Sequence, residues 1–89
     1  MAKVVVSFKV LPQDINIKLD DLKKAIKEGL PEEAEVYKFA EEPIAFGINA
    51  LLVHIVMPEN ISGEMDKVED AVKNTNGVGQ IEILMIHRT

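Results

Sequence analysis

The strongest constraint on the fold is an apolar run that starts after Gly47 and stops at Pro58. Most of its residues are Ile, Leu or Val, which pack well on a pleated sheet. The run has about half of the ~20 residues that a helix needs to cross a bilayer, so it does not predict a membrane span. We therefore predict that residues 48–57 form the most buried strand of a small sheet.

Both sides of this predicted strand are apolar. An antiparallel sheet with one solvated face normally alternates apolar and polar side chains. Apolar residues on both sides indicate either that both faces are buried or that one face is an exposed contact surface. The sequence leaves these two interpretations open. One side carries Ile48, Ala50, Leu52, His54 and Val56, and the other carries Asn49, Leu51, Val53, Ile55 and Met57.

Three further strands are predicted, at residues 3–11, 34–40 and 79–87. In the first of these, alternation places three valines and Phe8 on one face, with a serine and the lysines on the other. In the last strand, the residues predicted to share one face are Ile81, Ile83 and Met85.

Two helices are predicted from apolar side chains spaced three and four residues apart. The first covers residues 18–29. The second begins after Pro58, with Asn60 or Ser62 as its N-cap, and ends at residues 74–77 with a left-handed glycine. The two apolar stripes are Leu19, Leu22, Ile26 and Leu30, and Ile61, Met65, Val68 and Val72.

The order of these elements is strand, helix, strand, strand, helix, strand. This order predicts a ferredoxin-like α+β sandwich, in which a four-stranded antiparallel sheet carries both helices on one face. The strands at 3–11 and 48–57 are the longest apolar runs, so we expect them to be the central pair. With 89 residues, the chain is expected to form a single domain, 1–89.

Composition narrows the class of function. The net charge is −5, and one arginine is present, so we expect no direct nucleic-acid binding, which needs clustered basic residues. The absence of cysteine excludes disulfides and thiolate metal sites. The N-terminus has too short an apolar run for a signal peptide. We expect a cytoplasmic protein that does not bind membranes.

No residue set predicts catalysis, a metal site or a bound cofactor. His54 and His87 lie on separate strands without the spacing of a metal motif. The adjacent acids Glu41 and Glu42 are typical of solvated charge rather than of a desolvated catalytic pair. Neither Ser7 nor Ser62 lies in a nucleophile elbow. We therefore expect a binding protein and not an enzyme.

Two segments remain as candidate binding features. Residues 41–46 are predicted to form a loop, because Pro43 lacks an amide donor and Gly47 relaxes the backbone dihedral angles. Phe46, at the end of this loop, either faces outward or packs under its own loop. The second feature is the C-terminus, where Arg88 is the only guanidinium in the chain.

The segment Glu42-Pro43-Ile44-Ala45-Phe46-Gly47-Ile48, the opening strand that ends in Val10-Leu11-Pro12 and the order of elements together resemble the archaeal elongation factor 1-beta family. The resemblance covers essentially the whole chain. It implies a guanine-nucleotide exchange domain that binds the GTPase elongation factor 1-alpha, in its GDP-bound and nucleotide-free forms, and promotes exchange of GDP for GTP.

The same resemblance implies which residues bind the partner. Phe46 matches an aromatic side chain that enters an apolar pocket of the GTPase, and Arg88 stands where a lysine approaches the magnesium and phosphate site. An alternative is a small-ligand-binding or protein-interaction regulatory domain of the same fold. The implied partner-binding residues are Glu42, Pro43, Ile44, Phe46, Gly47, His87 and Arg88.

Overall fold

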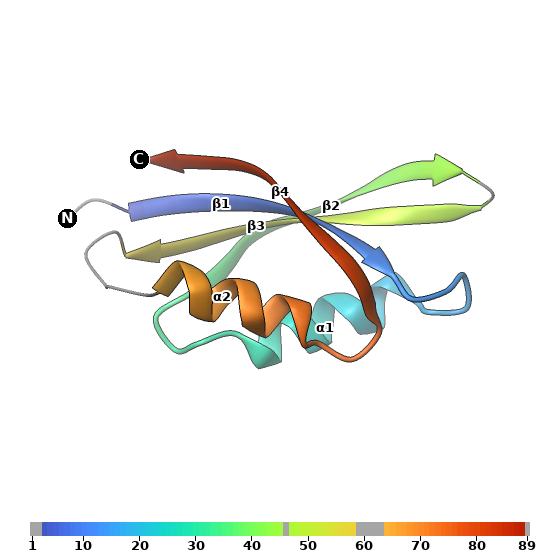
Figure 1. Cartoon of the computed structure of the whole chain (residues 1–89), viewed down its shortest axis with the longest axis horizontal. Helices are drawn as coiled ribbons and strands as arrows, with labels where there is room; N and C mark the ends of the chain where they lie inside the picture. The colour runs from blue at the N-terminus through green and yellow to red at the C-terminus, as the bar shows by residue number, and fades with distance from the viewer. Residues whose placement is uncertain (1–2, 46, 59–63, 89) are drawn as a thin grey trace.

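The computed structural model describes residues 3–45, 47–58 and 64–88. Within these ranges the chain forms two helices beneath one face of a four-stranded sheet (Figure 1). The predicted ferredoxin-like fold is confirmed. The elements are β1 (Lys3–Pro12), α1 (Leu19–Gly29), β2 (Glu35–Ala45), β3 (Ile48–Pro58), α2 (Glu64–Lys73) and β4 (Val78–Arg88).

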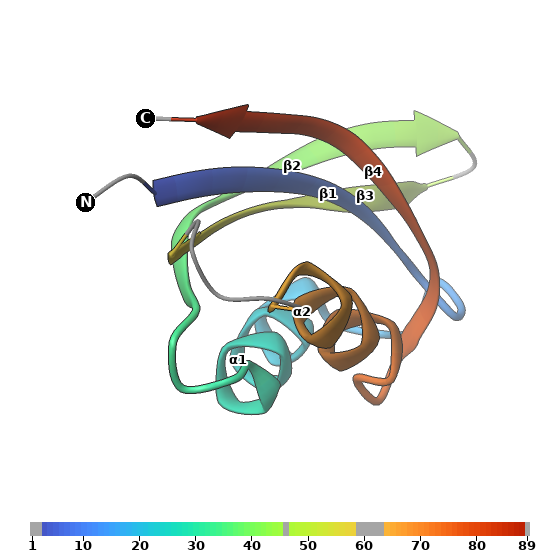
Figure 2. The same ribbon diagram turned by 60° about the vertical axis from the view of Figure 1, so that its left-hand side comes forward.

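The strands are arranged in the order β2-β3-β1-β4, and each neighbouring pair is antiparallel. β1 and β3 are therefore the central pair, as predicted, and β2 and β4 are the edges. Figure 2 shows that both helices lie on the same side of the curved sheet and that the two termini lie at the same end. The molecule is elongated, with extents of 42, 20 and 17 Å. Neither described helix is long and apolar enough to cross a membrane.

The core lies between the sheet and the helices. The predicted stripe of α1 is confirmed by the burial of Leu22 and Ile26, and that of α2 by the burial of Val68 and Val72. Burying an aliphatic side chain of this size is worth roughly 1.5–3 kcal/mol, so these two stripes hold the helices on the sheet. From the sheet, the fully buried side chains of the core cluster are Val6, Phe8, Val10, Leu51, Val53 and Ile55.

The prediction that residues 41–46 form a loop is wrong, because β2 continues to Ala45. Pro43 is paired with Asn49 inside the strand. A proline is compatible with β2 because an edge strand directs part of its amide groups away from the sheet, where no neighbouring strand needs them. A register shift at Ile44 then leads into the turn, where Gly47 has a φ of 77°. Phe46 lies outside the described residues.

The prediction that Ile81, Ile83 and Met85 share a face is also wrong. Ile83 is paired with Phe8, but the next paired residue is Met85, opposite Ser7, so Leu84 forms a β-bulge. A bulge inserts one residue and shifts the alternation of side chains by one position. Ile81 and Ile83 therefore face the helices, whereas Met85 lies on the open face of the sheet.

The end of α2 agrees with the prediction. The helix stops at Lys73, Thr75 Oγ1 donates to the carbonyl of Ala71 at 2.7 Å, and Gly77 has a φ of 97°. Gly79 then passes close to the end of β1, where an added Cβ would lie 3.1 Å from the Pro12 carbonyl oxygen. The proposed N-caps of this helix, Asn60 and Ser62, and the apolar Ile61 lie outside the described residues.

Candidate functional site

The first group of predicted site residues lies at the turn between β2 and β3. Ala45 is paired with Ile48, so the connection is a tight hairpin. Beside it, Pro43 is exposed, and the apolar residue Ile44 is 46% exposed. The hairpin therefore presents apolar surface to solvent at one end of the sheet.

Lysines of this chain hold the two acids that precede the hairpin. Lys9 Nζ of β1 lies 3.8 Å from Glu42 Oε1 across the open face, and Lys23 Nζ of α1 lies 3.3 Å from Glu41 Oε2. Lys23 also lies 6.0 Å from the centroid of the Phe39 ring. Such partly exposed pairs are each worth about 0–1 kcal/mol, so this part of β2 is positioned mainly by its backbone pairing with β3.

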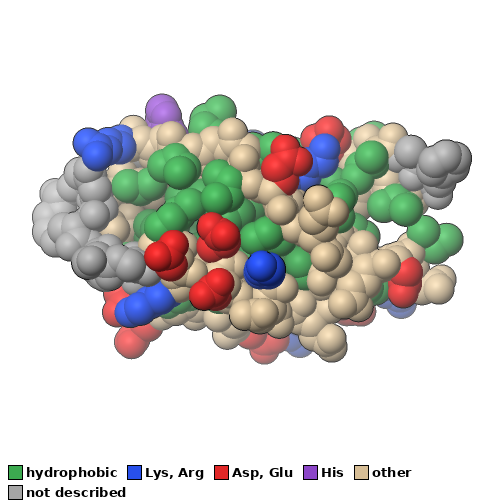
Figure 3. Space-filling view, viewed as in Figure 1, with side chains coloured by type: hydrophobic (Ala, Val, Ile, Leu, Met, Phe, Trp, Pro, Cys, Tyr) green, Lys and Arg blue, Asp and Glu red, His purple; other side chains and the backbone are tan. Residues whose placement is uncertain are grey.

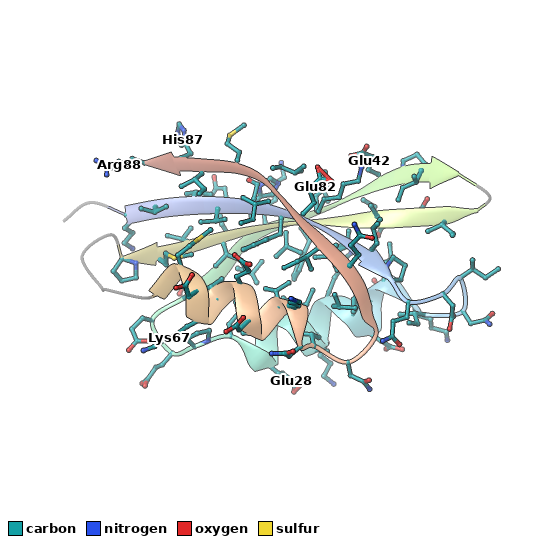
Figure 4. All side chains as sticks on the ribbon, in the orientation of Figure 1. Glu28, Glu42, Lys67, Glu82, His87 and Arg88 are labelled. Carbon is teal, nitrogen blue, oxygen red and sulfur yellow. The ribbon has the colours of Figure 1, made fainter. Side chains whose placement is uncertain are left out.

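The second group lies at the other end of the sheet. His87 is paired with Val5, and Arg88 is paired with Val4, so the final strand runs to the beginning of β1. Both side chains are exposed. Figure 4 shows His87 and Arg88 at the end of β4 near the two termini, whereas Glu42 lies toward the hairpin. The predicted residues thus form two separate groups, and the elongated sheet lies between them.

The open face between these ends carries a feature that sequence reasoning missed. Ser7 Oγ and His54 Nδ1 lie 2.6 Å apart at the centre of the sheet. Around them is a groove of about 700 Å³, here called the open-face groove. The residues that form it include Val5, Tyr37, His54, Val56, Met85 and His87.

The two apolar sides of strand β3 differ in burial. Leu51, Val53 and Ile55 are fully buried under the helices, whereas His54 and Val56 on the opposite side are only half-buried. The described structure therefore supports the second of the two interpretations, an exposed surface on one face. The signal that could have identified the groove was the presence of a histidine on a side of β3 that is otherwise apolar.

Apolar side chains are also exposed along the edge strand β4. Figure 3 shows apolar side chains gathered on the side of the molecule where the sheet lies above α2, with Asp and Glu side chains below them. The large exposed apolar residues of β4 are Ile83, Leu84, Met85 and Ile86.

Charge is divided unequally between the layers. The strands contain four of the ten basic residues and four of the fifteen acidic residues, so the helices and connections carry the whole net charge of −5. Among the described strand residues at the end of the sheet that holds the termini, Lys3 and Arg88 outnumber Glu35, and Lys38 lies next to His54 nearer the centre. The described strands are therefore locally basic at this end of an acidic protein. Among the described residues, no three His, Asp or Glu side chains are grouped as metal ligands.

Comparison with known proteins identifies the family. Residues 5–89 match the family described as the EF-1 guanine nucleotide exchange domain. The chain belongs to this family. Elongation factor 1-beta of Staphylothermus marinus is 49% identical over 88 residues, covering 99% of this chain and 98% of the relative. The proteins of the same name from Desulfurococcus amylolyticus and Ignicoccus hospitalis are 42% and 39% identical over 88 residues. They cover 99% of this chain and 98% and 94% of the relatives.

Membership gives this exchange domain a nucleotide-exchange role in translation elongation, as the resemblance predicted, and it does not favour the regulatory-domain alternative. A solved structure, the C-terminal domain of the MgtC protein from Mycobacterium tuberculosis, is similar with a TM-score of 0.57. That likeness covers 98% of this chain and 87% of that chain at 7% identity, so it shows the fold alone.

Proposed function

We propose that this exchange domain binds the GTPase elongation factor 1-alpha through both ends of its sheet and promotes the replacement of GDP by GTP. The observation that supports this is the separation of the two groups of site residues along a molecule 42 Å in length. One pocket of the GTPase cannot receive both groups. The hairpin and the C-terminal end of β4 therefore contact two different regions of the partner.

The hairpin supplies the apolar contact. Ile44 is 46% exposed, and the turn that follows it carries Phe46. Burying a Phe side chain against a partner is worth roughly 1.5–3 kcal/mol. At ~1.4 kcal/mol per decade, this corresponds to about 10- to 150-fold in affinity. The pairing of β2 with β3 continues to Ala45 and Ile48, so the hairpin is positioned before the partner binds.

The C-terminal end supplies the electrostatic contact. Arg88 extends the edge strand at the locally basic end of the sheet, near Lys3. A cation brought to the GTPase nucleotide site competes with the magnesium ion that neutralises the phosphates, and this weakens nucleotide binding. A guanidinium is planar and presents several donors, so it suits phosphate oxygens.

The exchange itself requires no bond to be made or broken by this chain. A protein that prefers the nucleotide-free GTPase weakens the binding of nucleotide to that GTPase. By thermodynamic linkage, bound nucleotide weakens the binding of the protein to the GTPase by the same ratio. The proposed residues accordingly act by binding the GTPase, and this chain needs no metal or cofactor of its own for that. We place this activity in the cytoplasm.

The test is the release of labelled GDP from elongation factor 1-alpha. The wild-type chain should accelerate release, and Phe46→Ala should reduce this by at least about tenfold if the ring is buried on binding. Ile44→Ala should reduce the acceleration less than Phe46→Ala does. Leu84→Ala is the matched control and should leave it nearly unchanged, because Leu84 lies outside the hairpin and both residues are 46% exposed. The absence of acceleration by the wild type would refute the proposal. If Ile44→Ala and Leu84→Ala had equal effects on GDP release, the hairpin would not be a contact with the GTPase.

A further inference from the structure

The open-face groove lies between the two ends that the proposed function assigns to the GTPase. His87 belongs to both the C-terminal end and the groove, since it lines the groove beside Met85. Across the sheet, the groove continues over β1 and β3 to Tyr37 on the opposite edge. A partner that contacts the hairpin and His87 from the open side of the sheet would therefore pass over this groove.

The walls of the groove combine apolar surface with polar groups. Val5, Val56 and Met85 supply the apolar part. The Ser7 side chain, in a residue that is 7% exposed, bonds His54 Nδ1 and so orients the imidazole ring. With Nδ1 engaged by Ser7, the ring nitrogen left for an interaction outside the chain is Nε2. When the Ser7 hydroxyl is the donor, Nε2 carries the proton and offers a donor to the groove.

The charged residues around the groove indicate which kind of partner segment would bind in it. Lys3 lines it, and Lys38 is paired with His54 on the neighbouring strand, whereas Glu35 is the acid in the lining. The helix layer, by contrast, carries the net negative charge of the chain. Charge complementarity therefore favours an occupant that brings carboxylates to the rim and apolar side chains to the floor.

We propose that the open-face groove holds an apolar segment of the GTPase that is flanked by acidic residues, as a third contact between the hairpin and the C-terminal end. This inference rests on the proposed function and extends it by naming the sheet surface that faces the partner. It accounts for why β3 is apolar on the side that no helix covers.

Two neighbouring residues of β4 provide the test. Met85 and Ile86 are each 59% exposed, but the register places Met85 on the open face and Ile86 on the helix side. A glutamate at either position should therefore cost similar stability, and only Met85→Glu places a carboxylate in the groove. Affinity for nucleotide-free elongation factor 1-alpha is measured by titration calorimetry, and folding of each variant is checked by thermal unfolding.

We expect Met85→Glu to weaken binding by at least about tenfold, since a charge placed in a desolvated contact is poorly tolerated. Ile86→Glu should remain within about twofold of the wild type, as expected for a residue outside the contact. Tyr37→Glu, on the other edge of the groove, should weaken binding as Met85→Glu does. Because Tyr37 is 71% exposed, this second variant is expected to fold.

Three results would overturn the inference. Equal loss from Met85→Glu and Ile86→Glu would mean that the β4 edge, not the open face, is the contact. Unchanged binding by both groove variants would mean that the face is not covered. A wild-type dimer in sedimentation that Met85→Glu abolishes would mean that a second copy of this chain occupies the groove. If wild-type exchange occurs while the groove variants bind normally, the groove contact fails and the proposed function stands.

Discussion

Ser7 and His54 join the two central strands through a side-chain bond of 2.6 Å between residues 47 positions apart in the chain. Ser7 is buried, so removing its partner would leave a buried hydroxyl without a bond. Leaving a buried polar group unsatisfied costs about 1–3 kcal/mol. The pair therefore stabilises the middle of the sheet on the face that no helix covers.

The pair can be tested by a double-mutant cycle. We expect Ser7→Ala to lower the free energy of unfolding by about 1 kcal/mol, which shifts the Tm of a domain of this size by about 4–8 °C. Ser7→Ala should cost much less in a His54→Phe background, because a phenyl ring leaves the Ser7 hydroxyl no nitrogen to bond. The free energies are measured by urea denaturation. A coupling energy near zero would show that the contact contributes nothing in solution.

Gly79 is expected to be required for packing rather than for its dihedral angles. A Cβ at this position would lie 3.1 Å from both Gln13 Cα and the Pro12 carbonyl oxygen, which are backbone atoms that cannot move aside. We expect Gly79→Ala to destabilise the chain by about 1–3 kcal/mol, the usual cost of overpacking. Gly29→Ala is the control, because its nearest neighbour would be Thr75 Oγ1 at 3.9 Å. Thermal unfolding of the two variants should differ by several degrees, and equal Tm values would contradict this account.

Gly47 is expected to be required for its backbone conformation alone. Its φ is 77°, and an added Cβ would meet nothing within 4 Å. A left-handed conformation costs a residue with a side chain about 1–2 kcal/mol. Gly47→Ala should therefore lower the stability by that amount, and Gly47→Asn should lower it less, since asparagine tolerates this region. The free energies of unfolding of the wild type and the two variants are compared by denaturant unfolding. An alanine variant as stable as the wild type would show that the left-handed conformation at Gly47 causes no strain.

The locally basic end of the sheet predicts how association depends on salt. Lys38 lies on the sheet beside the open-face groove, whereas Lys67 lies on α2 in the acidic layer. At low ionic strength, we expect Lys38→Gln to slow association with the GTPase by about two- to fivefold and Lys67→Gln to leave it nearly unchanged. The difference should shrink toward 0.5 M salt, where the screening length is only about 4 Å. Stopped-flow association rates check this, and equal rates for both variants would contradict an approach by the sheet.

Regular periodicity made most of this fold predictable. The buried stripes of α1 and α2 repeat every three or four residues, and β1 alternates from Val6 to Val10, so their faces could be read directly. The bulge at Leu84 could not be predicted from periodicity, because the residues around it are all apolar. The inserted residue moves Met85 to the other face of the sheet without changing the hydrophobic pattern.

The candidate site was less predictable than the fold. Pro43 was misleading, since its effect depends on whether the strand is an edge, which is a property of the whole sheet. The resemblance correctly identified the family, but it did not place Glu42 and Arg88 at opposite ends of the molecule. The contact between Ser7 and His54 depends on the register between β1 and β3, and no local pattern specifies that register.

The division of charge between the sheet and the helices affects how the protein interacts with the RNA that surrounds it during translation. In the proposed orientation, with the neutral strands toward the GTPase, the acidic helices point away from the complex. That outer coat repels the phosphate backbones of ribosomal and transfer RNA. In that orientation the docked pair would avoid adhering to the polyanions that surround it during translation.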